Sequence, residues 1–248
     1  YVLSIQYFNQ VINAKPYLYE PYFFRGLAKI NLDDFQGAEA DCNAAIQRNP
    51  FVVGAYQIRG LARIRQNNYD GAIEDYKTAL RYDPENLVLW HNLSLCHMQK
   101  EDYGAAKEDL GKLLKIAPRY TRAYLMRGEV SLKQKDTIQA LNDFEKAIEW
   151  LVSAGILNRI YNVSKMEHPL SAFDKLDQFK LFLFDTGLLK HMAGIDNSAI
   201  LLKADYQFKG PLTENYVLQQ FRGQFAVEPR YYSDKNGEID FLLQHGMD

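Results

Sequence analysis

The sequence of 248 residues has little cysteine and almost no excess of charge. It contains two cysteines, Cys42 and Cys96, and no C-x-x-C pair, so neither a disulfide framework nor a structural zinc site is expected. Its five histidines lack the H-E-x-x-H spacing of a catalytic zinc site. The formal net charge of −2 provides no global attraction to nucleic acid or to acidic membranes.

Long apolar runs and nucleotide-binding loops are also missing. No run of about 18 apolar residues occurs, so no membrane-spanning helix is expected. No G-x-x-x-x-G-K-[ST] loop occurs, so ATP hydrolysis is not supported. The sequence begins with Tyr1 rather than methionine, and we expect an incomplete start. A signal peptide therefore cannot be judged, and the compartment stays open.

A period of 34 residues dominates the first three-fifths of the chain, with prolines at positions 16, 50, 84 and 118. Each interval holds, at fixed offsets, an aromatic residue, a small residue, an alanine and a bulky or apolar residue. These residues are Tyr22, Gly26, Ala38, Cys42; Tyr56, Gly60, Ala72, Tyr76; Trp90, Ser94, Ala106, Leu110; Tyr124, Gly128, Ala140, Phe144. Small residues let helices cross closely, and large residues fill the space beside them. The pattern predicts stacked antiparallel helix pairs, each ended by a proline. Cys42 and Cys96 fall at packed positions of this pattern and are expected in the core.

These positions resemble the tetratricopeptide repeat, which implies an α-helical repeat superhelix over residues 1–149. Residues 1–15 align with the second helix of a repeat, so the array contains a half repeat and four full repeats. The resemblance implies that the first helix of each repeat lines a concave groove. The expected inward positions are Phe23, Leu27, Asn31, Gln57, Leu61, Arg65, His91, Leu95, Gln99, Leu125, Glu129 and Lys133. This groove is apolar in its middle and suits an amphipathic helix or an extended peptide.

Three arginines, Arg25, Arg59 and Arg127, recur one position before the small residue. They could hold an acidic ligand. They could instead form ion pairs with acidic residues of the second helices, such as Asp41, Asp75 and Asp109. We favour ion pairs because these aspartates recur with the same period.

Polar pairs mark the turns within the repeats. The pairs are Asp33-Asp34, Asn67-Asn68 and Glu101-Asp102. Such side chains favour turns and cap the helix that follows. We expect a second helix to begin after each pair.

The repeat signal ends near Ile148, and strands and helices are expected to alternate beyond it. Gly155 is expected to end a helix. The predicted strands cover 156–163, 179–184, 229–233 and 238–243, and the predicted helices cover 188–192 and 211–221. Residues 234–237 contain an Asn-Gly pair and predict a hairpin between the last two strands.

The strings WLVSAGIL, KLFLFDTGLL, GPLTENYVLQQF and YYSDKNGEIDFLL are similar to the C-terminal domain of a bacterial and archaeal AAA-type ATPase family. That domain has been related to the PD-(D/E)XK nuclease fold, so the resemblance implies a smaller α/β domain over residues 150–248. In that fold a helix glutamate and a strand aspartate hold a divalent metal, and a Glu-x-Lys on the next strand completes the site. Glu214 and Asp240 match the two acids, and Glu238 is the acid before Asp240.

The sequence departs from the pattern of this family in two ways, and both argue against catalysis. The chain ends at Asp248 before any Glu-x-Lys, so we expect an incomplete α/β domain. A repeat array stands where the family has its ATPase, and the sequence does not decide whether this junction is natural or artificial. Glu214 and Asp240 also have a structural interpretation, which we favour. Glu214 would lie in a first helical turn, and Asp240 would be an exposed strand residue.

The sequence therefore predicts a non-catalytic scaffold that binds a protein or peptide in the groove and needs no cofactor. The alternative is a metal-dependent nuclease-like domain on a repeat adaptor, with a divalent metal at Glu214 and Asp240, inactive without the Glu-x-Lys strand. Nucleic-acid binding around residues 150–165 is disfavoured, because Arg159 and Lys165 supply the only cations there. Partner identity and oligomeric state stay open, although an exposed sheet edge would favour pairing with a second chain.

Overall fold

The computed structural model describes residues 1–193, 209–224 and 228–244. The chain divides into two compact units, Tyr1–Ala147 and Ile148–Asp248, and each is described by itself. The domain boundary predicted from the sequence, between residues 149 and 150, lies two residues after this division. Within the described residues, no helix is both long enough and apolar enough to cross a membrane.

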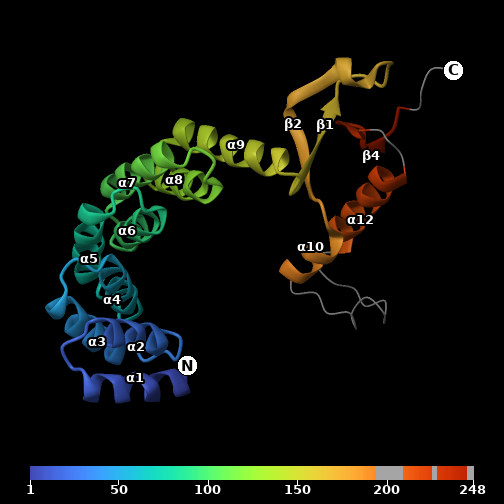
Figure 1. Cartoon of the computed structure of the whole chain (residues 1–248). Helices are drawn as coiled ribbons and strands as arrows, with labels where there is room; N and C mark the ends of the chain where they lie inside the picture. The colour runs from blue at the N-terminus through green and yellow to red at the C-terminus, as the bar shows by residue number, and fades with distance from the viewer. Residues whose placement is uncertain (194–208, 225–227, 245–248) are drawn as a thin grey trace. The chain divides into compact units, whose positions relative to one another are not determined.

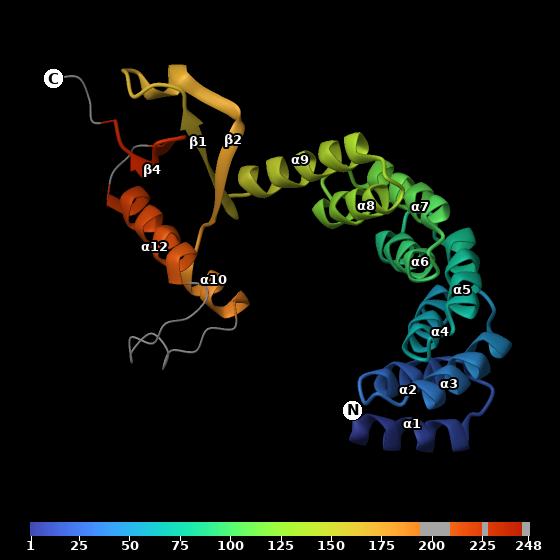
Figure 2. The same cartoon turned by 180° about the vertical axis from the view of Figure 1, so that it is seen from behind.

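The first unit is a stack of helices (Figures 1 and 2). A single helix, α1 (Val2–Ala14), precedes four pairs: α2 (Glu20–Ile30) with α3 (Phe35–Arg48), α4 (Val53–Arg65) with α5 (Tyr69–Tyr82), α6 (Leu87–Gln99) with α7 (Tyr103–Ile116), and α8 (Thr121–Lys133) with α9 (Thr137–Ser153). The first helices of the pairs lie on the inner side of the curved stack and the second helices on the outer side. The predicted helical repeat fold is confirmed.

The recurring aromatic residue ties each first helix to the segment before it. Its donor group, at the far end of the ring, bonds the carbonyl of the recurring proline: Tyr22 to Pro16 (3.3 Å), Tyr56 to Pro50 (3.0 Å), Trp90 to Pro84 (2.8 Å) and Tyr124 to Pro118 (3.1 Å). Tyrosine and tryptophan both combine a large apolar ring with such a donor. This shared property explains why Trp90 replaces tyrosine in the third repeat.

The turns within the repeats also recur. One residue in each adopts a left-handed conformation: Asp33, Asn67, Glu101 and Lys135, with φ of 58°, 60°, 59° and 63°. The next side chain accepts a hydrogen bond from a backbone N–H of the second helix, and these caps are Asp34, Asn68, Asp102 and Asp136. The three turns predicted from polar pairs are confirmed. The fourth turn was not predicted, because Lys135-Asp136 pairs a lysine with the capping aspartate, unlike the acidic or amide pairs of the other three turns.

Glycines at the small position allow the two helices of a repeat to approach. A Cβ atom on Gly60 would lie 2.8 Å from the ring of Tyr76, and one on Gly128 would lie 2.5 Å from the ring of Phe144. Tyr76 is completely buried. The bulky residue of the second helix therefore fills the space that the missing side chain leaves.

Two apolar clusters cross the boundaries between repeats. One joins Tyr76 and Ala79 of α5 to Leu89 and Leu93 of α6. The other joins helices α7 and α8. Both cysteines are free and buried, as predicted, and burial raises the pKa of each thiol to about 12.

The second unit contains a four-stranded sheet in the order β2-β1-β3-β4. Its elements are β1 (Leu157–Val163), the 3₁₀ helix η1 (Leu170–Phe173), β2 (Asp174–Leu183), α10 (Thr186–Met192), α12 (Lys209–Gln224), β3 (Arg230–Asp234) and β4 (Gly237–Leu242). Strand β1 pairs antiparallel with β2 and parallel with β3, and β3 pairs antiparallel with β4. Helix α12 places Leu218 against Ile160, Phe182 and Tyr231 of the sheet.

The predicted elements of this unit are present, including the hairpin, where Asp234 accepts hydrogen bonds from Asn236 and Gly237. Strand β2 begins at Asp174, five residues earlier than predicted. The added residues, Asp-Lys-Leu-Asp-Gln, are mostly polar and lack the apolar, β-prone pattern on which the prediction for 179–184 rests. Asp174 and Lys175 pair with Val163 and Asn162 of β1, beyond a register shift next to Tyr161, on an edge strand where polar side chains are tolerated.

The close contact at Gly128 can be tested with Gly128→Ala. Its added methyl group would collide with Phe144, and we expect a loss of about 1–3 kcal/mol of unfolding free energy. The matched control is Gly111→Ala on α7, where nothing lies within 4 Å of the added atom; a gain of about 0.5–1 kcal/mol is expected. Urea unfolding followed by circular dichroism measures both. Equal changes in the two variants would contradict the packing argument.

Candidate functional site

The recurring arginines bind aspartates of the second helices. The guanidinium Nη2 atoms of Arg25, Arg59 and Arg127 lie 2.5, 2.5 and 2.6 Å from carboxylate oxygens of the buried Asp41, Asp75 and Asp143. The hydrogen bond to Asp41 raises the pKa of Arg25, and the bond to Asp143 does the same for Arg127. The ion-pair interpretation is confirmed for Asp41 and Asp75, and these arginines are not a free row for an acidic ligand.

Asp109 departs from the expected pairing. The third repeat has Leu93 at the arginine position, and Asp109 instead lies 2.6 Å from Nδ1 of the buried His97. The imidazole reaches the carboxylate from one helical turn further along α6. Predicting an arginine partner for Asp109 was wrong, because its own repeat offers none.

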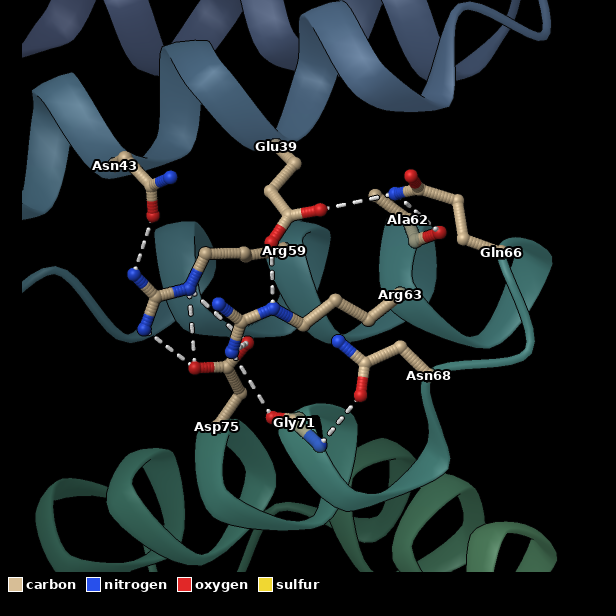
Figure 3. A network of polar contacts seen from close by, with 9 residues as sticks. All are labelled: Glu39, Asn43, Arg59, Ala62, Arg63, Gln66, Asn68, Gly71 and Asp75. Carbon is tan, nitrogen blue, oxygen red and sulfur yellow. Dashed lines mark hydrogen bonds and ion pairs between the residues drawn. The ribbon is translucent and has the colours of Figure 1, made fainter.

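A polar network joins the first and second full repeats (Figure 3). Asp75 accepts from both Arg59 and Arg63, the latter at 3.0 Å. The same two arginines reach back to α3, where Arg63 Nε lies 2.8 Å from Glu39 and Arg59 Nη1 lies 2.7 Å from Asn43. Burial acts to raise the pKa of Glu39, but its hydrogen bonds, first that from Arg63, lower this pKa overall. The network orients one repeat on the next.

The predicted groove residues lie on the first helices α2, α4, α6 and α8, with Asn31 at the end of α2. Seven are exposed: Leu27, Asn31, Arg65, Gln99, Leu125, Glu129 and Lys133. Four are half-buried: Phe23, Gln57, Leu61 and Leu95. His91 is only 8% exposed, because Tyr120 packs edge-on against its ring, so it offers little to a ligand.

The exposed charged residues at the groove positions differ from the half-buried arginines Arg25, Arg59 and Arg127, which are ion-paired. Arg65, Glu129 and Lys133 form no ion pair among the residues that the structure describes. A cavity of about 260 Å³ is formed by residues of α4, α5 and α6. It is lined by Ile64, Tyr69, Leu95, Cys96 and Gln99. Two predicted groove residues, Leu95 and Gln99, thus border a recess with apolar walls.

In the second unit, three acidic side chains converge on one lysine. Lys180 of β2 places its Nζ atom 2.5 Å from Glu238 and 2.9 Å from Asp240, both on β4, and 3.5 Å from Glu214 on α12. Burial acts to lower the pKa of Lys180, but its hydrogen bonds to Glu238 and Asp240 raise it overall. The structure thus brings together the acids singled out in the sequence, around an ammonium group.

Sequence reasoning missed Lys180. The available signal was a lysine inside the apolar run Phe-Lys-Leu-Phe-Leu-Phe, a position where an unpaired charge would be costly. Within the part of the chain that the structure describes, no group of three or more His, Cys, Asp or Glu residues is arranged to hold a metal ion. A metal at Glu214 and Asp240 stays a prediction.

The buried network can be tested with Asp75→Asn. Removing this carboxylate, which is 2% exposed, leaves Arg59 without its anion and Arg63 with Glu39 alone, and we expect a loss of about 3 kcal/mol of unfolding free energy. The control is Asp70→Asn on the same helix, because the side chain of Asp70 is 79% exposed and pairs with Lys100; a loss below about 1 kcal/mol is expected. Similar losses in both variants, measured by urea unfolding, would show that burial does not govern these ion pairs.

Solved structures of MamA are similar in fold to this chain. A crystal structure of MamA has a TM-score of 0.59 and 21% identity, and the match covers 60% of this chain and 88% of that chain. MamA 41-end from Desulfovibrio magneticus RS-1 has a TM-score of 0.58 and 19% identity, with coverage of 60% and 84%. At sequence identities of 21% and 19%, this structural similarity establishes a shared fold and nothing further.

Family models match the sequence in three places. A domain of unknown function, DUF8612, matches residues 98–199. No curated protein matches the sequence, and none of the comparisons supports the resemblance of residues 150–248 to AAA-type ATPases. Tetratricopeptide repeat models match residues 23–86 and 63–130. The chain therefore contains tetratricopeptide repeats.

Proposed function

We propose that the protein is a non-catalytic scaffold whose repeat groove binds a peptide segment of a partner protein, with apolar and acidic side chains. The observation that carries this proposal is the difference between two sets of cations. Arg25, Arg59 and Arg127 form ion pairs with aspartates of the second helices. Arg65 and Lys133 are exposed at groove positions and have no ion pair within the described residues.

The middle of the groove supplies the apolar part of the proposed contact. Leu27, Leu61 and Leu95 occupy equivalent positions on three successive first helices, and Leu27 is 37% exposed. An amphipathic segment lays its apolar side chains on such a row, while its charged side chains reach the rim. Acidic side chains of the segment would meet Arg65 and Lys133, which supply the complementary charge.

A library of random peptides displayed on phage tests this function. Selection on the intact protein should enrich sequences that combine Asp or Glu with Leu or Phe. Fluorescence anisotropy with a selected peptide should show roughly tenfold weaker binding to Arg65→Glu and to Leu27→Asp, about 1.4 kcal/mol each.

The controls make the same changes on second helices. They are Arg81→Glu on α5 and Leu141→Asp on α9, both at exposed positions, and the selected peptide should bind them as it binds the unchanged protein. Selection of basic peptides, or equal losses in the control variants, would overturn the proposal.

A second candidate function is divalent-metal binding by Glu214 and Asp240. It is favoured by the approach of both carboxylates to one atom, Nζ of Lys180. Carboxylate oxygens are the ligands that hard divalent cations prefer. The ammonium group lies among the carboxylates, so a metal would have to displace it. We propose weak binding without nuclease turnover.

Calorimetric titration of Mn²⁺ tests this second function. We expect weak saturable binding to the protein, its loss in Glu214→Ala and Asp240→Ala, and tighter binding in Lys180→Ala, because the competing ammonium group is removed. Glu228→Ala is the control, since the side chain of Glu228 is 79% exposed and does not contact Lys180. No heat of binding in the unchanged protein or in Lys180→Ala would reject the metal site.

A further inference from the structure

A cavity of about 420 Å³ lies beside Lys180. Most of its wall is apolar and comes from β1, β2, α10 and the start of α12: Leu157, Leu181, Phe182, Leu183, Leu189 and Pro211. Three polar residues complete the wall: Lys180, Glu214 and Asn215. The cavity therefore has mostly apolar walls, and one part of its wall carries Glu214, a member of the acidic group around Lys180.

Asn215 is 1% exposed, and the hydrogen bonds around it fix which way its amide points. The backbone N–H of Thr186 must donate, so the Gln219 atom 3.2 Å away is the oxygen Oε1. The Thr186 hydroxyl lies 2.6 Å from this same oxygen and must also donate to it. The hydroxyl oxygen can then only accept, which it does from Nδ2 of Asn215 at 3.2 Å. Oδ1 of Asn215 is left as a buried acceptor without a partner in the described residues.

The charges around the cavity favour a cation. Glu214, Glu238 and Asp240 together carry three formal negative charges against the single positive charge of Lys180. Lys180 lies closer to Glu238 and Asp240 than to Glu214, which is 3.5 Å away. Glu214 on the cavity wall therefore keeps accepting capacity, and the neighbouring Oδ1 of Asn215 needs a donor.

We propose that this cavity binds an organic ammonium group on a short apolar stem, as in a free alkylamine or a lysine side chain. The stem would lie against Phe182, Leu189 and Pro211, and the ammonium group would donate to Glu214 and to Oδ1 of Asn215. An ammonium group has donors only, and the two groups that it meets are acceptors. This site belongs to the second unit and goes beyond the scaffold function, so neither proposal depends on the other.

Amide NMR spectra of the intact protein, recorded during titration with n-butylammonium in the presence of EDTA, test the proposal. We expect saturable shifts for residues of β2 and α12, and no saturation with n-butanol or butyrate at equal concentration. Glu214→Gln should weaken binding at least fivefold, while Glu228→Gln should leave it unchanged. Asn215→Leu, if its spectrum shows an intact fold, should also weaken binding, because the acceptor is removed.

A parallel titration with lysine blocked at both backbone ends separates the two sources of the ligand. Binding of both compounds supports a lysine side chain of a peptide as the ligand, and binding of n-butylammonium alone supports a free amine. Shifts that do not saturate with n-butylammonium, or that n-butanol reproduces equally, overturn the proposal. EDTA excludes metal-mediated effects, and the groove variants Arg65→Glu and Leu27→Asp should bind the amine normally.

Discussion

The repeat array depends on the close approach of the two helices within each repeat. At Gly60 and Gly128 the first helix has no side chain, and the ring of Tyr76 or Phe144 occupies that space. This approach also buries the aspartate of the second helix, so an arginine of the first helix must compensate its charge, as Arg59 does for Asp75. The steric and electrostatic parts of the repeat therefore support each other.

The third repeat shows that this constraint can be met in a different way. It has Ser94 in place of glycine, and its hydroxyl donates to the carbonyl of His91 within the same helix at 2.7 Å. It has Leu93 in place of arginine, and His97 contacts the buried Asp109 instead. The aspartate keeps a polar partner although the residue type and the position of that partner have both changed. Burial of the carboxylate is thus the constant feature, and the compensating group varies.

The 34-residue period determined which features could be predicted from the sequence. Packing positions such as Gly60 and Asp75 were predictable because equivalent neighbours recur every 34 residues. The burial of His91 was not predictable from the period, because the aromatic ring of Tyr120 covers it. Lys180 was not predictable in this way, because Glu214 and Asp240 lie 34 and 60 residues beyond it in a non-repeating region. Only the folded sheet and helix α12 bring them together, and the pairing of β2 with β1 likewise depends on tertiary contacts.

The uneven distribution of polar contacts has a mechanical consequence for the array. Arg59 and Arg63 hold the first and second full repeats through directional bonds to Asn43 and Glu39. Between the second and third repeats, α5 and α6 meet mainly through apolar side chains, and the Lys100–Asp70 pair there is exposed. Apolar contact has no preferred direction, so surfaces held by it can slide and rotate at low cost. Torsional stiffness is therefore lower at this junction than between the first and second full repeats, and the pitch of the stack can adjust there.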